Sequence, residues 1–86
     1  MKFRLSNHAL EELGRRDIPH DLVDRVLQNP QQVLAERDGK KIYQSQVEFV
    51  GGKIFLLRVI VNEEVEPAVV VTVYRTSKIE KYWRQS

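Results

Sequence analysis

Two long apolar segments near the end of the chain constrain the fold more than any other feature of the sequence. IFLLRVIV spans Ile54 to Val61 and AVVVTVYR spans Ala68 to Arg75, with a short polar loop between them. Both have the length of a strand and are rich in β-branched residues. A strand that is apolar on both faces is typical of the interior of a sheet. We therefore expect this pair at the centre, with helices over one face and another element over the other.

The residues before this pair predict a hairpin. Val33 to Arg37 leads to Asp38-Gly39, a dipeptide favoured in two-residue turns, and a second strand follows from Lys41 to Val50. Gly51-Gly52 then supplies another tight turn into the first apolar segment. Four strands joined in sequence by short loops predict an antiparallel meander.

Sequence signals of helices lie toward the two ends of the chain. A first helix is predicted from Asn7 to Arg16, supported by acid-to-base pairs from Glu11 to Arg15 and from Glu12 to Arg16. A second begins at Pro19 and ends at Asn29-Pro30. A third, short helix is expected to start near Ser77, which forms the S-x-x-E pattern of a capping box with Glu80. The predicted fold is α+β: two N-terminal helices on a four-stranded antiparallel meander, with a short C-terminal helix.

Length and composition set the broad class. The 86 residues suit one domain, 1–86, and the absence of cysteine excludes disulfides and thiolate chemistry. His8 and His20 show no metal-ligand spacing, so neither a metal nor another cofactor is expected. Without a secretion signal or a membrane-length apolar run, a cytoplasmic protein with no membrane partner is expected. The formal net charge is +2, and residues 75–86 hold four Lys/Arg against one Asp/Glu.

Arg58 is the most informative single position, because it interrupts an otherwise apolar strand. An unpaired cation there is costly. Two interpretations are open at this point: an ion pair with a carboxylate such as Glu48 on a neighbouring strand, or a site for an anion.

The junction between the last strand and the last helix concentrates polar and cationic residues, namely Arg75, Thr76, Ser77 and Lys78. Helix N-termini favour phosphate through free N–H groups and the helix dipole. The alternative is that Ser77 only caps the helix while both cations are solvated. Tyr74, Tyr82 and Trp83 suit packing, and aromatics interleaved with cations also suit RNA.

His8 is a candidate general base or acid in the first turn of helix one, although a histidine among exposed polar neighbours is commonly a surface residue. The sequence has no Gly-rich phosphate loop, nucleophile elbow or HExxH helix. Its histidine, arginine, lysine, tyrosine and hydroxyl side chains fit metal-free RNA cleavage, in which a base removes the 2′-OH proton and cations stabilise the phosphorane.

A family resemblance rests on several of these residues: His8-Ala9, Arg16, Ile18, Val26-Leu27, Asn29-Pro30 and Thr72 to Lys78. They resemble the domain of unknown function family 4258, which is similar in layout to BrnT and RelE-like ribonuclease toxins. The resemblance implicates His8, Arg16, Arg58, Arg75, Thr76, Ser77 and Lys78. Where the family pattern often has a further arginine in the first helix, this chain has Glu12.

Two hypotheses follow. The first is a metal-independent endoribonuclease of the toxin type, held in check by an antitoxin protein, with His8, Arg58 and Arg75 as catalytic residues. Arg16, Thr76, Ser77, Lys78 and Tyr82 then bind RNA. The second is a noncatalytic RNA-binding or protein-interaction module on the same fold. Convergence of His8 with Arg58 and Arg75 in one groove favours catalysis, whereas a solvated His8 elsewhere together with an Arg58 paired to a carboxylate favours binding.

Overall fold

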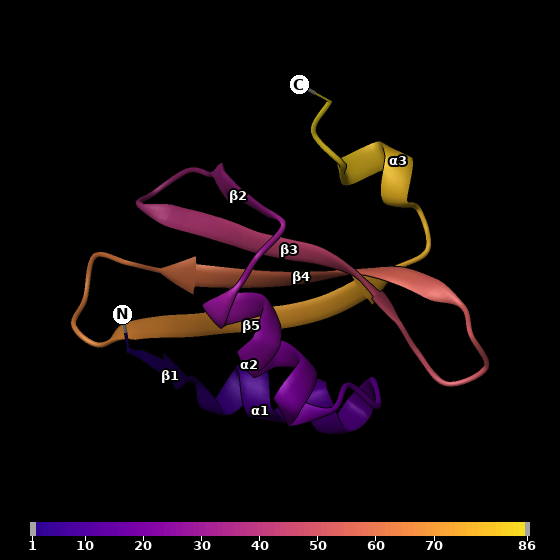
Figure 1. Ribbon diagram of the computed structural model, residues 1–86. Helices are drawn as coiled ribbons and strands as arrows, with labels where there is room; N and C mark the ends of the chain where they lie inside the picture. The colour runs from indigo at the N-terminus through magenta and orange to yellow at the C-terminus, as the bar shows by residue number, and fades with distance from the viewer. Residues whose placement is uncertain (1, 86) are drawn as a thin grey trace.

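The computed structural model describes residues 2–85 and contains five strands and three helices (Figure 1). In chain order these are β1 (Phe3–Leu5), α1 (Asn7–Arg15), α2 (His20–Gln28), β2 (Gln32–Ala35), β3 (Lys40–Glu48), β4 (Ile54–Asn62), β5 (Ala68–Thr76) and α3 (Ile79–Tyr82). None of the helices within the described range is long and apolar enough to cross a membrane.

The sheet is mixed, which corrects the predicted four-stranded antiparallel meander. Its strand order is β1-β5-β4-β3-β2. The four strands from β2 to β5 pair with antiparallel neighbours, as a meander requires. The fifth strand, β1, pairs parallel to β5 on the far edge. The α+β class is therefore confirmed, while the strand number and the purely antiparallel pairing were wrong.

The missed strand is the short segment Phe3–Leu5. Phe3 lies opposite Ala68 and Leu5 opposite Val70, and the backbone N–H of Ser6 donates to the Val70 carbonyl at 3.0 Å. Three residues are too few to show an alternating pattern. Their partner also lies about 65 residues away along the chain, so no local turn points to the pairing.

Both hairpin turns formed where the glycine dipeptides predicted them. Asp38 and Gly39 have positive φ angles of 60° and 71°, and the Glu36 N–H donates to the Lys40 carbonyl at 2.9 Å across this turn. Gly51 and Gly52 also have positive φ, and the Phe49 N–H donates to the Lys53 carbonyl at 2.9 Å across that turn. These turns fix the register of β3 on its neighbours.

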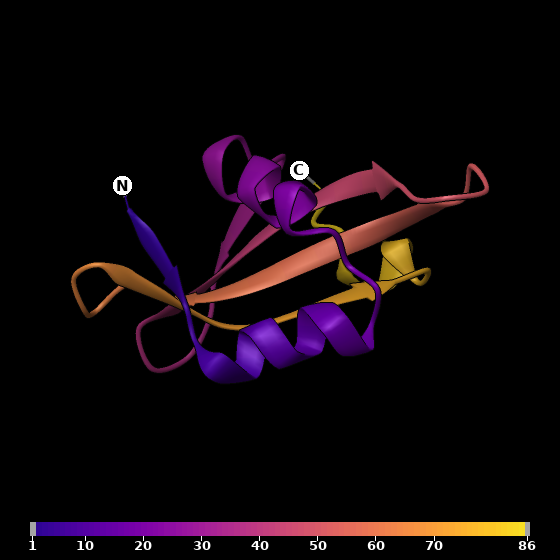
Figure 2. The same cartoon turned by 90° about the horizontal axis from the view of Figure 1, so that it is seen from below.

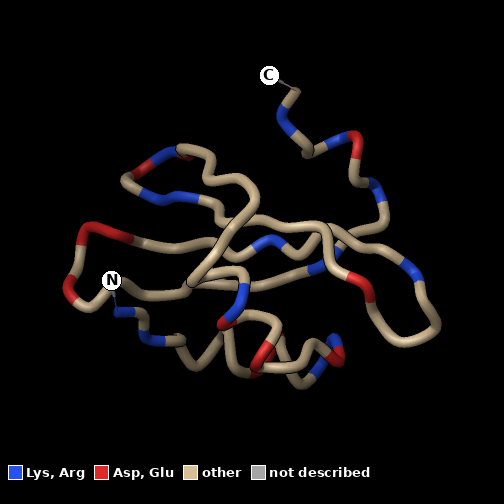
Figure 3. The backbone as a smooth tube through the Cα atoms, in the orientation of Figure 1, with Lys and Arg blue, Asp and Glu red and all other residues tan. Residues whose placement is uncertain are grey.

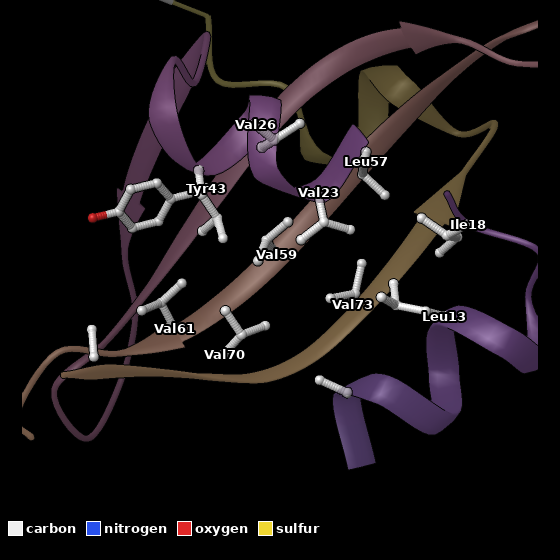
Figure 4. Close-up of a cluster of buried hydrophobic side chains, with 13 residues drawn as sticks. Leu13, Ile18, Val23, Val26, Tyr43, Leu57, Val59, Val61, Val70 and Val73 are labelled. Atoms are coloured by element: carbon white, nitrogen blue, oxygen red, sulfur yellow. The ribbon is translucent and has the colours of Figure 1, made fainter. Parts of the chain in front are cut away.

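The two N-terminal helices cover one face of the sheet, which we call the helix face. Ser6 caps α1 by accepting a hydrogen bond from the Ala9 N–H at 3.0 Å, and α2 follows Pro19 as expected. Ala9 and Leu13 of α1 and Val23 and Val26 of α2 are buried against Val59 and its neighbours (Figure 4). Burial of this apolar stripe is the main force holding the helices on the sheet.

The opposite face, which we call the α3 face, carries residues that alternate with those of the helix face along each strand. Leu56 and Ile60 of β4 and Ile42 of β3 are buried on it. The last helix, α3, lies across the sheet from α2 (Figures 1 and 2). Both faces of β4 are therefore covered, as its apolar sequence predicted.

Candidate nucleic-acid interface

A row of four polar side chains crosses the α3 face. Gln32 of β2 lies opposite Gln44 of β3, Gln44 opposite Arg58 of β4, and Arg58 opposite Tyr74 of β5. Residues directly opposite one another in antiparallel strands project from the same face, so the register alone places these four side chains in a line.

Arg58 is the centre of this row and is only 7% exposed. Its Nε donates to Gln44 Oε1 at 2.8 Å, and its Nη1 donates to the Tyr74 hydroxyl at 2.5 Å. The ring of Tyr82 in α3 lies 4.3 Å from the guanidinium carbon, a cation–π distance. The guanidinium is therefore enclosed by an amide, a phenol and an aromatic ring.

The charge of Arg58 has no counter-charge among the described residues. The carboxylates that form salt bridges within residues 2–85 are those of Glu12 and Glu63, and neither pairs with Arg58. The expected partner Glu48 lies four residues along β3 from Gln44, a separation of about 13 Å for an extended strand. The ion-pair interpretation is corrected: neutral groups satisfy the guanidinium, and its positive charge stays uncompensated.

The C-terminal segment, residues 79–85, contains α3 and is attached over this row by side-chain hydrogen bonds. Gln32 Nε2 donates to the Arg84 carbonyl at 2.8 Å, and the Arg84 N–H donates to Gln32 Oε1 at 3.1 Å. Gln44 Nε2 donates to Gln32 Oε1 at 2.7 Å and to the Tyr82 carbonyl at 3.2 Å. Two glutamine side chains thus join the segment to the sheet.

The predicted short C-terminal helix is present and starts two residues after Ser77, but the predicted capping box of Ser77 with Glu80 was wrong. The hydroxyl of Thr76 accepts from the Lys78 N–H at 3.1 Å, whereas Ser77 is exposed and caps nothing. The helix begins at Ile79, after Lys78 as its N-cap with no side-chain cap bond, and has four residues. The Thr76 hydroxyl reaches the backbone locally and so moves the helix start beyond the S-x-x-E pattern.

Exposed cations gather along this end of the chain. Lys78, Lys81 and Arg84 are all exposed, and Glu80 is the one acidic residue among them (Figure 3). With Arg58 beneath, the α3 side carries a local excess of positive charge. Such an excess attracts a polyanion at low ionic strength.

Arg75 lies elsewhere, at one end of the helix face. Its guanidinium carbon is 4.5 Å from the Phe49 ring centre and 4.8 Å from that of Phe55. These side chains line an open hollow of about 620 Å³ together with Lys53, Glu48, Asp17, Asp21, Leu22, Pro19 and Val50. The lining holds two cations and three carboxylates, so this hollow is not electropositive.

The remaining predicted site residues do not join the Arg58 row. His8 is exposed in the first turn of α1, on the element that covers the helix face. Arg16 follows the last turn of the same helix, about 12 Å along its axis. Its Nε donates to Glu12 Oε1 at 2.6 Å. The three predicted catalytic residues, His8, Arg58 and Arg75, are therefore not brought together.

Glu12 forms ion pairs with two arginines at the C-terminal end of α1. It is buried, and it pairs with Arg16 and with Arg15. The pKa of the Glu12 carboxyl is lowered from 4.5, chiefly by the hydrogen bond from Arg16. Burial of Glu12 acts in the opposite direction and raises the pKa. Arg15 pairs with Glu12 and not with Glu11, which was the partner expected from the sequence.

Gln32 and Gln44 were not identified from the sequence. Only an approximate signal existed for Gln44. Counting outward from a two-residue Gly51-Gly52 turn places its neighbour Ser45 opposite Arg58. The observed pairing of Phe49 with Lys53 shifts the register by one residue and brings Gln44 there. No comparable signal existed for Gln32, whose contact with Arg84 joins residues 52 apart.

The chain matches one family model, described as "Domain of unknown function (DUF4258)", over residues 5–75. No curated protein and no solved structure matches it. The matched range contains the row from Gln32 to Tyr74 and ends before α3.

Proposed function

Since the chain belongs to the DUF4258 family, whose description names no activity, we propose from the geometry of the α3 face that this protein binds single-stranded RNA without cleaving it. The observation that carries the proposal is Arg58, a buried cation held only by neutral groups. A phosphate of the ligand supplies the missing counter-charge.

The surroundings of Arg58 suit RNA in two ways. Lys78, Lys81 and Arg84 offer exposed cations for neighbouring phosphates. Tyr82 and Trp83, both partly exposed, present aromatic rings on which bases stack. Cations interleaved with aromatic rings are the usual features of sequence-tolerant single-strand binding.

A binding role fits the positions of the predicted catalytic residues better than cleavage does. General base catalysis requires the base within hydrogen-bond reach of the 2′-OH whose phosphate the cations hold. His8 is on α1, which packs on the helix face, while Arg58 points to the α3 face. One RNA strand does not engage both side chains in this arrangement.

Metal-independent endoribonuclease activity of the toxin type remains the second candidate, favoured by one contact. Arg58 Nη1 touches the Tyr74 hydroxyl, and an arginine beside a phenol can stabilise a phosphorane and protonate a leaving oxygen. An antitoxin partner belongs to this candidate. The likeness in layout to BrnT and RelE-like toxins stays a prediction.

The test is RNA affinity measured against salt, by fluorescence anisotropy of a labelled mixed-sequence single strand. Lys78→Glu and Lys81→Glu should each weaken binding and reduce the steepness of its salt dependence by roughly 0.7 for each phosphate that the variant no longer binds. Arg4→Glu, an exposed cation on β1, is the matched control and should leave the slope unchanged. Absence of binding at low salt, or equal slopes in all four proteins, contradicts the proposal.

The same RNA, incubated with wild type, Arg58→Ala and His8→Ala, distinguishes binding from cleavage. Intact RNA after incubation with excess chelator supports the binding role. Products ending in 2′,3′-cyclic phosphate, absent with Arg58→Ala but still formed by His8→Ala, would instead support cleavage at the α3 face.

A further inference from the structure

Arg58 is covered by the C-terminal segment. The guanidinium is 7% exposed, and the Tyr82 ring lies over it at 4.3 Å. A phosphate therefore cannot reach this cation while Tyr82 stays in place. If Arg58 binds an anion, the C-terminal segment has to move first.

Besides the contacts of the Tyr82 ring with Arg58 and Tyr74, the segment is held by few hydrogen bonds, all between uncharged groups. The Gln32 side-chain amide bonds to both the N–H and the carbonyl of Arg84, as a neighbouring strand would. A single bond from Gln44 reaches the Tyr82 carbonyl. The helix α3 has four residues, none of them buried. An element with little buried area and few hydrogen bonds is among the first parts of a protein to open.

We propose that residues 79–85 form a strap that closes over Arg58 and lifts to admit a phosphate of single-stranded RNA. In the open state Arg58, Gln44 and Tyr74 present one guanidinium, one amide and one hydroxyl to the anion. The RNA part of this inference rests on the proposed function. The strap regulates affinity, because a site that is open only part of the time binds more weakly in proportion to its open fraction.

The hydrogen bonds from Gln32 to the backbone of Arg84 provide a sharp test. Arg84→Pro removes the backbone N–H that Gln32 Oε1 accepts, whereas Arg84→Ala keeps it, and the two variants lose the same charge. The preceding residue, Trp83, has φ −75° and ψ 126°, a conformation that tolerates a following proline. Arg84→Pro should therefore open the strap about fivefold more often, and Arg84→Ala should not.

Two measurements report the opening without RNA. Trp83 is the single tryptophan of the chain and lies in the segment, so its quenching by acrylamide follows the strap. Modification of Arg58 by phenylglyoxal, mapped by mass spectrometry and referred to the exposed Arg4, follows the uncovering of the site. Both should increase in Arg84→Pro, with Arg84→Ala close to wild type.

Gln32→Ala removes both hydrogen bonds to Arg84 from the sheet side, together with the acceptor of Gln44 Nε2, and should open the strap at least as often as Arg84→Pro. Gln28→Ala, at an exposed position of α2, is its control. Equal Arg58 modification in Arg84→Pro and Arg84→Ala, with Gln32→Ala matching wild type, would overturn the strap.

RNA affinity separates the strap from the proposed function. Tighter binding by Arg84→Pro than by Arg84→Ala, about fivefold, supports both. Greater Arg58 modification without RNA binding in any variant supports the strap and overturns the proposed function. Greater modification with equal RNA affinity in the two variants overturns the regulation proposed here and leaves RNA binding to the exposed cations.

Discussion

Arg58 and Gln44 lie directly opposite one another on β4 and β3, and the 2.8 Å hydrogen bond between Arg58 Nε and Gln44 Oε1 leaves a buried cation resting on a neutral amide. In most proteins a buried arginine is paired with a carboxylate. Here the sheet keeps the charge without pairing it, which is the arrangement that a site for an external anion requires.

The pair predicts a strong coupling between two substitutions. Gln44→Leu alone should lower the free energy of unfolding by about 2–3 kcal/mol, because it removes the acceptor of a buried charged donor. Adding Arg58→Met removes that donor and should recover most of the loss. Urea unfolding of the two single variants and the double variant measures the coupling, and additive losses would contradict this account of the site.

Two glycines should respond to alanine with opposite signs. Gly39 has φ +71°, and an added Cβ lies 2.2 Å from the Glu64 side chain, so Gly39→Ala should destabilise by about 1–2 kcal/mol. Gly14 is exposed in α1 with no atom near its added Cβ, so Gly14→Ala should stabilise by about 0.5–1 kcal/mol. Thermal unfolding of both variants measures the two shifts. A destabilised Gly14→Ala would show that α1 is packed more tightly than described.

Stability should decrease in acid through Glu12. Its pKa in the folded protein is below the ordinary 4.5, chiefly through the hydrogen bond from Arg16. The contribution is therefore present above pH 4.5 and is lost as the pH falls through the folded value. In Glu12→Gln, urea midpoints should fall less steeply between neutral and acid pH than in wild type. Glu11→Gln, an exposed neighbour on α1, is the control and should follow wild type.

Removal of the side-chain hydroxyl should affect α3 differently at two neighbouring residues, Thr76 and Ser77. Thr76→Val removes the acceptor of the Lys78 N–H and should weaken α3 by about 1 kcal/mol, read as a change in Trp83 fluorescence and hydrogen exchange of the segment. Ser77→Ala should have little effect, since Ser77 is exposed and caps nothing. The reverse order of effects would restore the predicted capping box.

The parts of the fold that could be predicted are those set by local sequence. The positive φ at Asp38 and Gly39, the cap at Ser6 and the continuous apolar run of β4 each depend on neighbouring residues. The parts that could not are set by distant partners. Phe3 finds β5, and Gln32 finds Arg84, through contacts that no nearby residue specifies.

The same limit applied to the site. That Arg58 needs a partner followed from its position in an apolar strand, but the identity of that partner depended on the register of three strands and on Tyr82. The position of His8 relative to Arg58 depended on which sheet face α1 covers, and the periodicity of a helix does not specify that face.

The parallel pairing of β1 with β5 also bears on the order in which the chain folds during synthesis. Phe3 to Leu5 are made about 65 residues before their partners Ala68 to Val70. Long-range closure of this kind is entropically unfavourable and slow compared with the local β3–β4 hairpin. Strand β1 must therefore stay unpaired until β5 has emerged, so it joins the sheet late although it is made before the strand it pairs with.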